Sequence, residues 1–287
     1  MKSADISAMV SRFRPALWPF IWAHALAGFV AAHGKEALGL DADSWLQGLV
    51  AGGHWAVLLG GSAAALAAAF NTEDGMQSAE RGTPNGETHS TPRSALDTPH
   101  SMLGWLALAL LLIGLGTSPA IAWWYFDAYL VGVILVVAYA APPLQLSALR
   151  LGGVAAQAFG YGALTFYSGY AASNDPAFRA EFSPLYLIGF ILLFLALRLA
   201  LKPHSAKWRA ALYWLFLAGA FGCLAAAEIR LGNRLGTALL IVPLAGWCVA
   251  GLRRDPRRPD EPSLSAAAGL GLCLATDAGV ALTSLLR

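Results

Sequence analysis

The sequence predicts an all-α polytopic membrane protein, a bundle of nine transmembrane helices that forms a single domain over residues 1–287. The composition is 57% hydrophobic and only 13% charged, and the mean hydropathy is +0.57. A soluble globular domain carries about 25% charged residues, so this chain holds more apolar side chains than a soluble core can bury. The apolar residues also fall into stretches that match the roughly 20 residues of helix needed to cross a bilayer.

These apolar stretches follow one another along the whole chain. In order they cover residues 15–33, 49–70, 101–119, 121–141, 153–172, 185–202, 210–229, 235–252 and 264–286. They are rich in Ala and Gly, as in Ala63–Ala69, and small residues let helices approach closely in lipid. The longest polar segment, 71–100, separates the second stretch from the third and is rich in turn-forming residues.

The distribution of Lys and Arg predicts a cytoplasmic N-terminus. With that orientation, the polar segments on the cytoplasmic side hold all of the 19 Lys and Arg residues except Lys35, Arg179, Arg230, Arg234 and Arg287. Such a bias is typical of membrane insertion, so the net charge of +2 does not indicate a nucleic-acid partner. We expect an integral protein of a bacterial inner membrane with its active face toward the cytoplasm.

A polar cluster, Asn71–Glu80, directly follows the second stretch. If the helix continues past Phe70, Asn71 and Asp74 share one face of it and Glu80 lies on the adjacent face. Carboxylate and amide oxygens on successive turns can hold Mg²⁺, which also prefers retained waters and substrate phosphates. The cluster therefore predicts a metal site, and the alternative is a solvated loop with ordinary acids.

Three segments on the predicted cytoplasmic side carry recognisable motifs. They are Arg14–Pro19 before the first helix, Phe70–Pro84 with its closing Gly-Thr-Pro, and Tyr139–Gly153, which has a Tyr-x-x-x-Pro-Leu pattern followed by Gly-Gly. Together these segments resemble the UbiA superfamily of intramembrane prenyltransferases, and most closely the branch that prenylates dihydroxynaphthoate in menaquinone synthesis. The number of helices and the placement of the loops agree with that family over the whole chain.

The resemblance implies an enzyme that binds an isoprenyl diphosphate and transfers its prenyl group to a small lipophilic acceptor, such as a quinone precursor. Asn71 and Asp74 would be catalytic and would hold Mg²⁺ together with Glu80, and Tyr139 would contact the substrate. Departure of pyrophosphate leaves an allylic cation, which a nucleophile attacks. Metal ions offset the leaving-group charge, and a cavity closed to water protects the cation.

The chain departs from the family pattern in both acidic motifs. The acids of the first motif are shifted by one or two positions, and no acid occurs between Glu181 and Glu228, where the second motif belongs. The connector after the sixth helix is basic instead and holds Arg198, Lys202, Lys207 and Arg209.

Two hypotheses follow from this basic connector. In the first, its cations bind the diphosphate directly, and the chemistry needs one Mg²⁺ ion or none. In the second, they are positive-inside anchors, and the protein is a non-catalytic relative that acts as an isoprenoid or lipid binder, a subunit or an assembly factor. A different reaction on the same fold, such as cyclisation, is a further possibility. The oligomeric state is open.

Asp277 lies in the middle of the last stretch, where an acid costs about 2.5–3.5 kcal/mol on insertion scales. It either lines a cavity and contacts substrate, or is a buried acid bonded to Thr276 or to the backbone of a neighbouring helix. His24 is expected to be packed or interfacial. In the fifth stretch, a set of tyrosines lines a cavity or is ordinary packing: Tyr161, Tyr167 and Tyr170. Other polar residues are expected to be solvated at the outer interface: His54, Asp127, Glu228 and Arg230.

Overall fold

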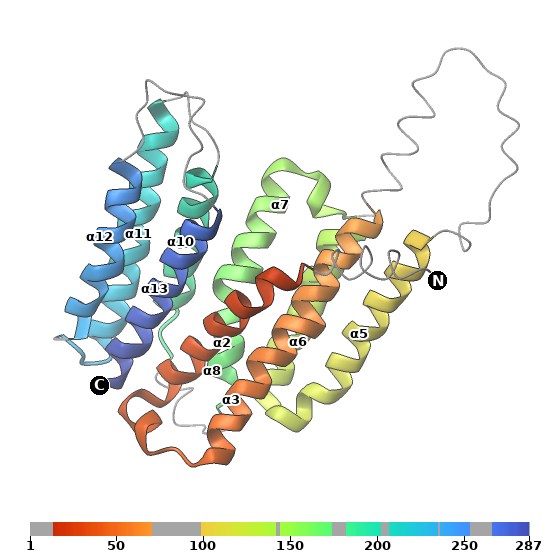
Figure 1. Ribbon diagram of the computed structural model, residues 1–287, viewed down its shortest axis with the longest axis horizontal. Coiled ribbons are helices and arrows are strands. Elements are labelled where there is room, and N and C mark those ends of the chain that lie inside the picture. Colours follow the sequence, from red (N-terminus) through yellow and green to blue (C-terminus); the bar gives the residue numbers. More distant parts are fainter. Residues whose placement is uncertain are drawn as a thin grey trace, which may run out of the picture.

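The computed structural model describes residues 14–70, 99–141, 144–173, 182–201, 207–234, 236–252 and 266–286, and every element within these ranges is helical (Figure 1). The α-helices are α2 (Trp18–His33), α3 (Ala42–His54), α5 (Pro99–Ile121), α6 (Trp123–Ala140), α7 (Arg150–Gln157), α8 (Thr165–Ala171), α10 (Leu185–Ala200), α11 (Lys207–Arg230), α12 (Ile241–Leu252) and α13 (Ala266–Leu285). Four short 3-10 segments are η1 (Pro15–Leu17), η2 (Gly34–Gly39), η4 (Leu146–Ala148) and η6 (Gly236–Leu240).

Two segments of π-helix lie inside longer helices. The first, η3 (Trp55–Gly61), continues α3 and leads into a further helical segment over residues 62–70. The second, η5 (Ala158–Leu164), joins α7 to α8 without a break. A π turn carries one extra residue per turn and is frequent at functional sites.

Within the described residues, six helices are long and apolar enough to cross a membrane. They are Pro15–Gly39, Ala42–Phe70, Met102–Ile121, Trp123–Ala140, Trp208–Arg230 and Ala267–Leu285, and two shorter apolar helices are Leu185–Ala200 and Gly236–Gly251. The predicted fifth stretch is also helical but is not among the six, because its glycines, tyrosines and Gln157 lower its hydropathy. The helical membrane protein is thus confirmed, whereas nine complete crossings remain a prediction.

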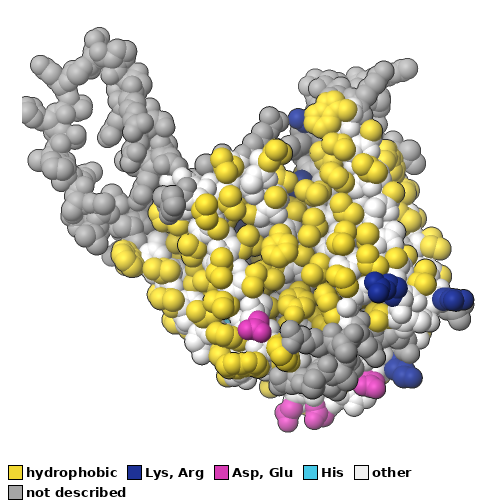
Figure 2. All heavy atoms as spheres, turned by 180° about the vertical axis from the view of Figure 1, so that it is seen from behind, with side chains coloured by type: hydrophobic (Ala, Val, Ile, Leu, Met, Phe, Trp, Pro, Cys, Tyr) yellow, Lys and Arg dark blue, Asp and Glu magenta, His cyan; other side chains and the backbone are white. Residues whose placement is uncertain are grey.

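Side-chain exposure agrees with a lipid environment. Large apolar residues such as Leu112, Ile134 and Val242 are exposed on the outside of the bundle. Figure 2 shows apolar side chains covering most of the described surface in that view, while the visible acidic side chains lie in its lower part. In water such a surface would be unfavourable, but lipid solvates it.

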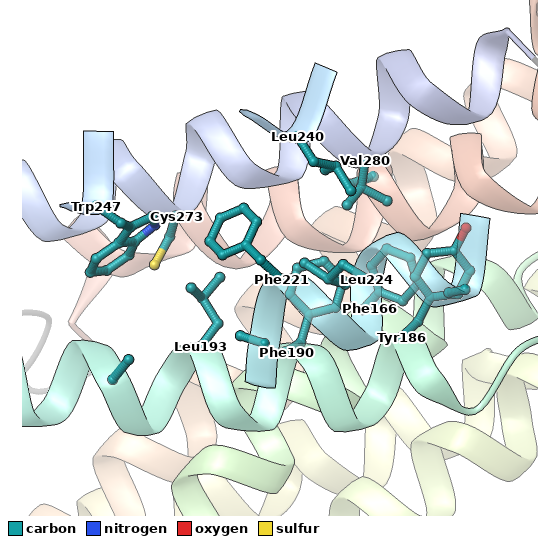
Figure 3. Close-up of a cluster of buried hydrophobic side chains, with 14 of the residues drawn as sticks. Phe166, Tyr186, Phe190, Leu193, Phe221, Leu224, Leu240, Trp247, Cys273 and Val280 are labelled. Carbon is teal, nitrogen blue, oxygen red and sulfur yellow. The ribbon is translucent and has the colours of Figure 1, made fainter. Parts of the chain in front are cut away.

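The helices pack as two groups that share α2. Figure 1 shows α10, α11, α12 and α13 side by side at one side and α3 and α5 at the other, with α2, α7 and α8 between them. One cluster of buried side chains surrounds Trp55, Tyr125 and Tyr129, and α2 contributes Phe29 to it. The second cluster, drawn in Figure 3, joins residues of α8, α10, α11, α12 and α13, with Phe166 near its centre.

Close contact between α2 and α8 depends on glycine. A Cβ atom at Gly169 would overlap the carbonyl oxygen of Ala25, and one at Gly28 would overlap the carbonyl oxygen of Phe166. Each glycine therefore lets the backbones of the two helices touch, as small residues do in membrane bundles. The α2–α8 contact is the centre of the fold, because α2 also packs against α3 and α13.

Substituting Gly169 by alanine is expected to destabilise the protein by about 3 kcal/mol, the upper end of typical overpacking penalties, because a carbonyl of a packed helix cannot move aside. The matched control is Gly222→Ala on α11, where a Cβ meets nothing within 4 Å. Thermal unfolding in detergent should show a clear loss for the first variant and little change for the second. Equal stabilities for the two variants would contradict this account of the α2–α8 contact.

Glu228 is an example of a wrong prediction. It was expected to be solvated at the outer interface, but its side chain is completely buried (0% exposed). The Tyr186 hydroxyl donates to Glu228 Oε1, the Ser284 hydroxyl donates to the same oxygen at 3.3 Å, and Asn233 Nδ2 donates to Oε2 at 3.4 Å. These donors replace water around the carboxylate, so the acid is a joint between α10, α11 and α13 rather than a surface group.

Candidate ligand-binding cavity

A cavity of about 500 Å³ opens among the helices at the end of the bundle that is predicted to face the cytoplasm. Small-molecule sites typically measure roughly 300–1,000 Å³. The lining residues come from η1 and α2, from η3 and residues 62–70, from α6, from α7 to α8, from α10 and from α13. Because α2 and α7 begin at this end while α6 and α10 finish there, segments far apart in the sequence meet around one space.

One wall of the cavity is a face made of very small residues. It is formed by Gly60, Ala63, Ala64, Ala67 and Ala68. These positions recur at three- and four-residue intervals, so they lie on one side of the helix. Small side chains along a whole face leave volume that larger residues would fill. This face ends two residues before Phe70, the last described residue before the predicted acidic cluster.

Both π-helical segments also line the cavity. Trp55 and Leu59 come from η3, and Gly160, Tyr161 and Leu164 come from η5. The hydroxyl of Thr165, the first residue of α8, donates to the carbonyl oxygen of Gly160 in η5, five residues earlier, at 2.9 Å. The irregular turns of two different helices therefore face the same space.

The polar lining residues are few and mostly lie near the open end of the cavity, here called the rim. Arg14 is exposed there and has a backbone φ of 50°, a left-handed conformation that is uncommon for a residue other than glycine. Arg198, in the last turn of α10, is half-buried, and its Nε has no hydrogen-bond partner among the described residues. Gln157 Nε2 donates to the Tyr139 hydroxyl at 2.5 Å.

The rim is therefore electropositive. Two guanidinium groups line it, and no Asp or Glu lines the cavity in the part of the chain that the structure describes. A buried N–H group without a partner is costly unless a ligand satisfies it. Arg198 and Arg14 are consequently suited to an anion, because a guanidinium group matches the geometry of phosphate oxygens.

The structure brings together only part of the predicted set. Arg198 and Tyr139 line the cavity, but Arg209 does not, and its guanidinium lies 5.3 Å from the centre of the Trp208 ring. Lys207 is the first residue of α11, and its side chain is outside the described part. Lys202 also lies outside the described residues.

The predicted metal ligands Asn71, Asp74 and Glu80 all lie outside the described residues. Within the ranges that the structure covers, no group of three or more His, Cys, Asp or Glu side chains is arranged to hold a metal ion. The described residues therefore do not fit Mg²⁺, and a magnesium site in the segment after Phe70 stays a prediction.

Asp277 does not line the cavity; it is buried behind it and pairs with His24. Asp277 Oδ1 lies 2.6 Å from His24 Nδ1, while His24 Nε2 lies 2.9 Å from the carbonyl oxygen of Gly162. A carbonyl only accepts, so Nε2 must carry a proton. The ring of Phe20, a lining residue, is stacked parallel to the imidazole, with 6.2 Å between the two ring centroids. His24 is thus packed, as expected. The partner of Asp277 is the His24 imidazole rather than Thr276 or a backbone group.

The structure also places the three tyrosines of the fifth predicted stretch and His54. Tyr161 lines the cavity and stacks on Phe194 at 6.2 Å, as one of the two interpretations of the tyrosines predicts. Tyr167 and Tyr170 instead pack against Phe182. His54 is only half-buried, and its ring nitrogens contact the hydroxyl groups of Tyr125 at 3.0 Å and Thr117 at 2.8 Å.

Several lining residues had no role in the sequence prediction, among them Trp55, Gln157 and Thr165, and Arg14 entered it only as the first residue of the Arg14–Pro19 motif. Gln157 had a usable signal, since a lone amide in a crossing helix usually faces the interior of the bundle or a cavity. Trp55 and Thr165 carry no such signal, because their role depends on which helices surround them.

Comparisons of the chain with protein-family models, with curated proteins and with solved structures find no match. The evidence for function is therefore the chain's own. It consists of an apolar cavity among membrane helices and an electropositive rim.

Proposed function

We propose that this protein is an intramembrane prenyltransferase that binds an isoprenyl diphosphate in the cavity and transfers the prenyl group to a small lipophilic acceptor. The observation that carries the proposal is the combination of an apolar cavity with two arginines, Arg14 and Arg198, at its rim. An isoprenyl diphosphate has the complementary form, with a strongly anionic head and a purely hydrocarbon tail. The resemblance to the UbiA superfamily supports the same substrate.

The diphosphate binds at the rim and the tail enters the cavity. Arg198 donates to phosphate oxygens, and its buried Nε gains the acceptor that it lacks among the described residues. The tail contacts the face of small residues between Gly60 and Ala68 and the aliphatic side chains opposite it. This contact removes apolar surface of the tail and of the cavity from water. The Tyr139 hydroxyl, which accepts from Gln157, keeps its own proton available for a further oxygen.

The proposed reaction breaks the bond between the allylic carbon and the diphosphate oxygen, and pyrophosphate leaves with the electron pair. A carbon atom of the acceptor forms the new bond and then loses a proton to the departing pyrophosphate. Arg14 and Arg198 offset the charge that grows on the leaving group. Apolar walls exclude water from the allylic cation, and the ring of Tyr161 offers a π face to it.

Binding of farnesyl diphosphate to the purified protein in detergent tests the proposal. We expect micromolar affinity, much weaker binding of farnesol, which lacks the anionic head, and loss of affinity at high salt. Transfer is then measured with dihydroxynaphthoate and related phenols, with mass spectrometry of the product. Repeating both assays with EDTA separates a magnesium-dependent enzyme from one that relies on arginine alone.

The outcomes separate the two candidate functions. Product formation supports the transferase, and its loss in EDTA supports the predicted magnesium site. Tight binding of the diphosphate without product or pyrophosphate release from any acceptor favours a non-catalytic isoprenoid binder. Equal affinity for farnesol and farnesyl diphosphate, or no binding of either, rules out the electropositive rim as a diphosphate site.

A further inference from the structure

We propose that Trp55 closes the deep end of the cavity and sets the longest hydrocarbon chain that the site accepts. The inference rests on the proposed function, because it concerns the tail of the same ligand. The deep end, here called the floor, is formed by Trp55, Thr165 and Gly132, with Leu59 beside them. Trp55 is the largest side chain of this group, so it is the residue expected to stop a chain that enters from the rim.

The arginines of the rim are more exposed than the residues of the floor. Arg14 is exposed and Arg198 is half-buried, whereas Trp55 is 2% exposed and Thr165 is 1% exposed. Three lining helices run from the rim toward the floor. Each of them has one lining residue near the rim and another deeper in the bundle. These pairs are Ala68 and Trp55, Tyr139 and Gly132, and Gln157 and Thr165. At about 1.5 Å per residue, the separations correspond to depths of roughly 10–20 Å.

Trp55 is held in place by a hydrogen bond and by aromatic contacts. Its indole Nε1 donates to the Thr165 hydroxyl at 3.1 Å, and that hydroxyl donates in turn to the carbonyl oxygen of Gly160 at 2.9 Å. The indole ring also packs edge-on against Tyr125 and Tyr129, with centroid distances of 6.2 and 5.9 Å. A chain that pushes Trp55 aside must break this bond and disturb a close-packed cluster.

Gly132 leaves the space in which the Trp55 ring lies. A Cβ atom at Gly132 would lie 2.8 Å from Leu59 Cδ2 and 3.1 Å from Trp55 Cη2. Because Gly132 itself lines the cavity, an alanine at position 132 adds a methyl group at the floor and crowds both side chains, which reduces the space there. Two substitutions at the floor are thus expected to act in opposite directions, Trp55→Leu lengthening the available space and Gly132→Ala reducing it.

The test measures the affinity of the purified protein in detergent for geranyl, farnesyl, geranylgeranyl and geranylfarnesyl diphosphate. For the wild-type protein, affinity should rise with chain length and then fall sharply at the first chain that reaches Trp55. One methylene group in an apolar pocket changes discrimination by roughly 10–200-fold. Trp55→Leu should therefore raise the relative affinity for the first excluded chain at least about tenfold, and Gly132→Ala should lower it for the longest accepted chain.

The matched control is Trp247→Leu. Trp247 is as buried as Trp55 and its indole also donates to a threonine hydroxyl, that of Thr276, but it does not line the cavity. This control should cost stability without moving the chain-length profile. If Trp55→Leu does not fold, Trp55→Phe should shift the profile in the same direction by a smaller amount.

An unchanged profile in the folded Trp55 variant, with clear binding of the shorter diphosphates, overturns the assignment of the floor and leaves the proposed function intact. A shift of the same size in Trp247→Leu also overturns it, because the effect would then come from general loosening of the core. Absence of binding for every diphosphate rejects the proposed function itself.

Discussion

Replacing Arg198 by alanine is expected to weaken the binding of farnesyl diphosphate by about 30-fold or more. The estimate follows from the roughly 2–5 kcal/mol lost when one partner of a buried, charge-assisted hydrogen bond is removed, at about 1.4 kcal/mol per tenfold. Arg198→Lys should recover only part of the loss, because lysine restores the charge but not the planar fork. Isothermal titration or a competition assay in detergent measures both effects.

The Arg198→Ala substitution should not lower the stability of the ligand-free protein, although it lowers the affinity for the diphosphate. Arg198 Nε is buried without a partner among the described residues, and such a group costs about 1–3 kcal/mol. Its removal should leave the empty protein as stable as the wild type or slightly more stable. A residue whose role is only structural would lose stability and affinity together, so the opposite signs identify a group that is kept for its ligand.

Arg209→Ala is the matched control for this prediction. Both arginines belong to the same basic connector, but Arg209 does not line the cavity. Its removal should change affinity by less than about threefold, because Arg209 is half-buried outside the cavity and does not touch the space where the ligand binds. If Arg209→Ala weakens binding as much as Arg198→Ala does, the whole connector attracts the diphosphate by its charge and the cavity geometry is not the recognition element.

The helices of this protein could be predicted from the sequence because hydropathy is a local property. Each of the nine predicted stretches coincides with helical residues in the described ranges, including the fifth, whose polar content is the highest. Hydropathy alone does not specify the number of crossings, since two of the helices have only 16 residues each, Leu185–Ala200 and Gly236–Gly251. Helix length depends on tilt and packing, which no local pattern specifies.

The site could be predicted only in part, because it is assembled from distant segments. Arg198 and Tyr139 were found through the basic connector and a motif, but the same connector also suggested Arg209. The direction in which a residue at a helix end points is set by the rotation of the helix, and one residue changes it by about 100°. The π turns that carry Trp55 and Tyr161 have no recognisable sequence pattern.

Buried polar pairs are the least predictable feature. His24 and Asp277 are 253 positions apart, and nothing near either residue names its partner. Glu228 was assigned to the interface because it stands near a helix end, but Tyr186, Ser284 and Asn233 supply donors from other segments. An intramembrane acid does indicate that a partner exists, and only the packed bundle shows which residue it is.

Removal of either member of the His24–Asp277 pair is expected to destabilise the protein by about 3–5 kcal/mol, the usual cost of leaving a buried ionisable group without its partner. Ordinary interhelical hydrogen bonds in membrane proteins contribute only about 0.6 kcal/mol. The loss of about 3–5 kcal/mol should apply here, because both side chains are at most 5% exposed and Asp277 Oδ2 already lacks a partner among the described residues. Thermal and denaturant unfolding in detergent measure the loss for His24→Leu and Asp277→Ala.

The double variant decides between a buried pair and two independent packing contacts. If the pair is the cause, His24→Leu combined with Asp277→Ala should lose less stability than the sum of the single variants, because no ionisable group is then left alone. Asp127→Ala, at an exposed acid of α6, is the control and should stay within about 0.5 kcal/mol of the wild type. Strict additivity would show that His24 and Asp277 act separately, and α2 and α13 would then be joined by apolar packing alone.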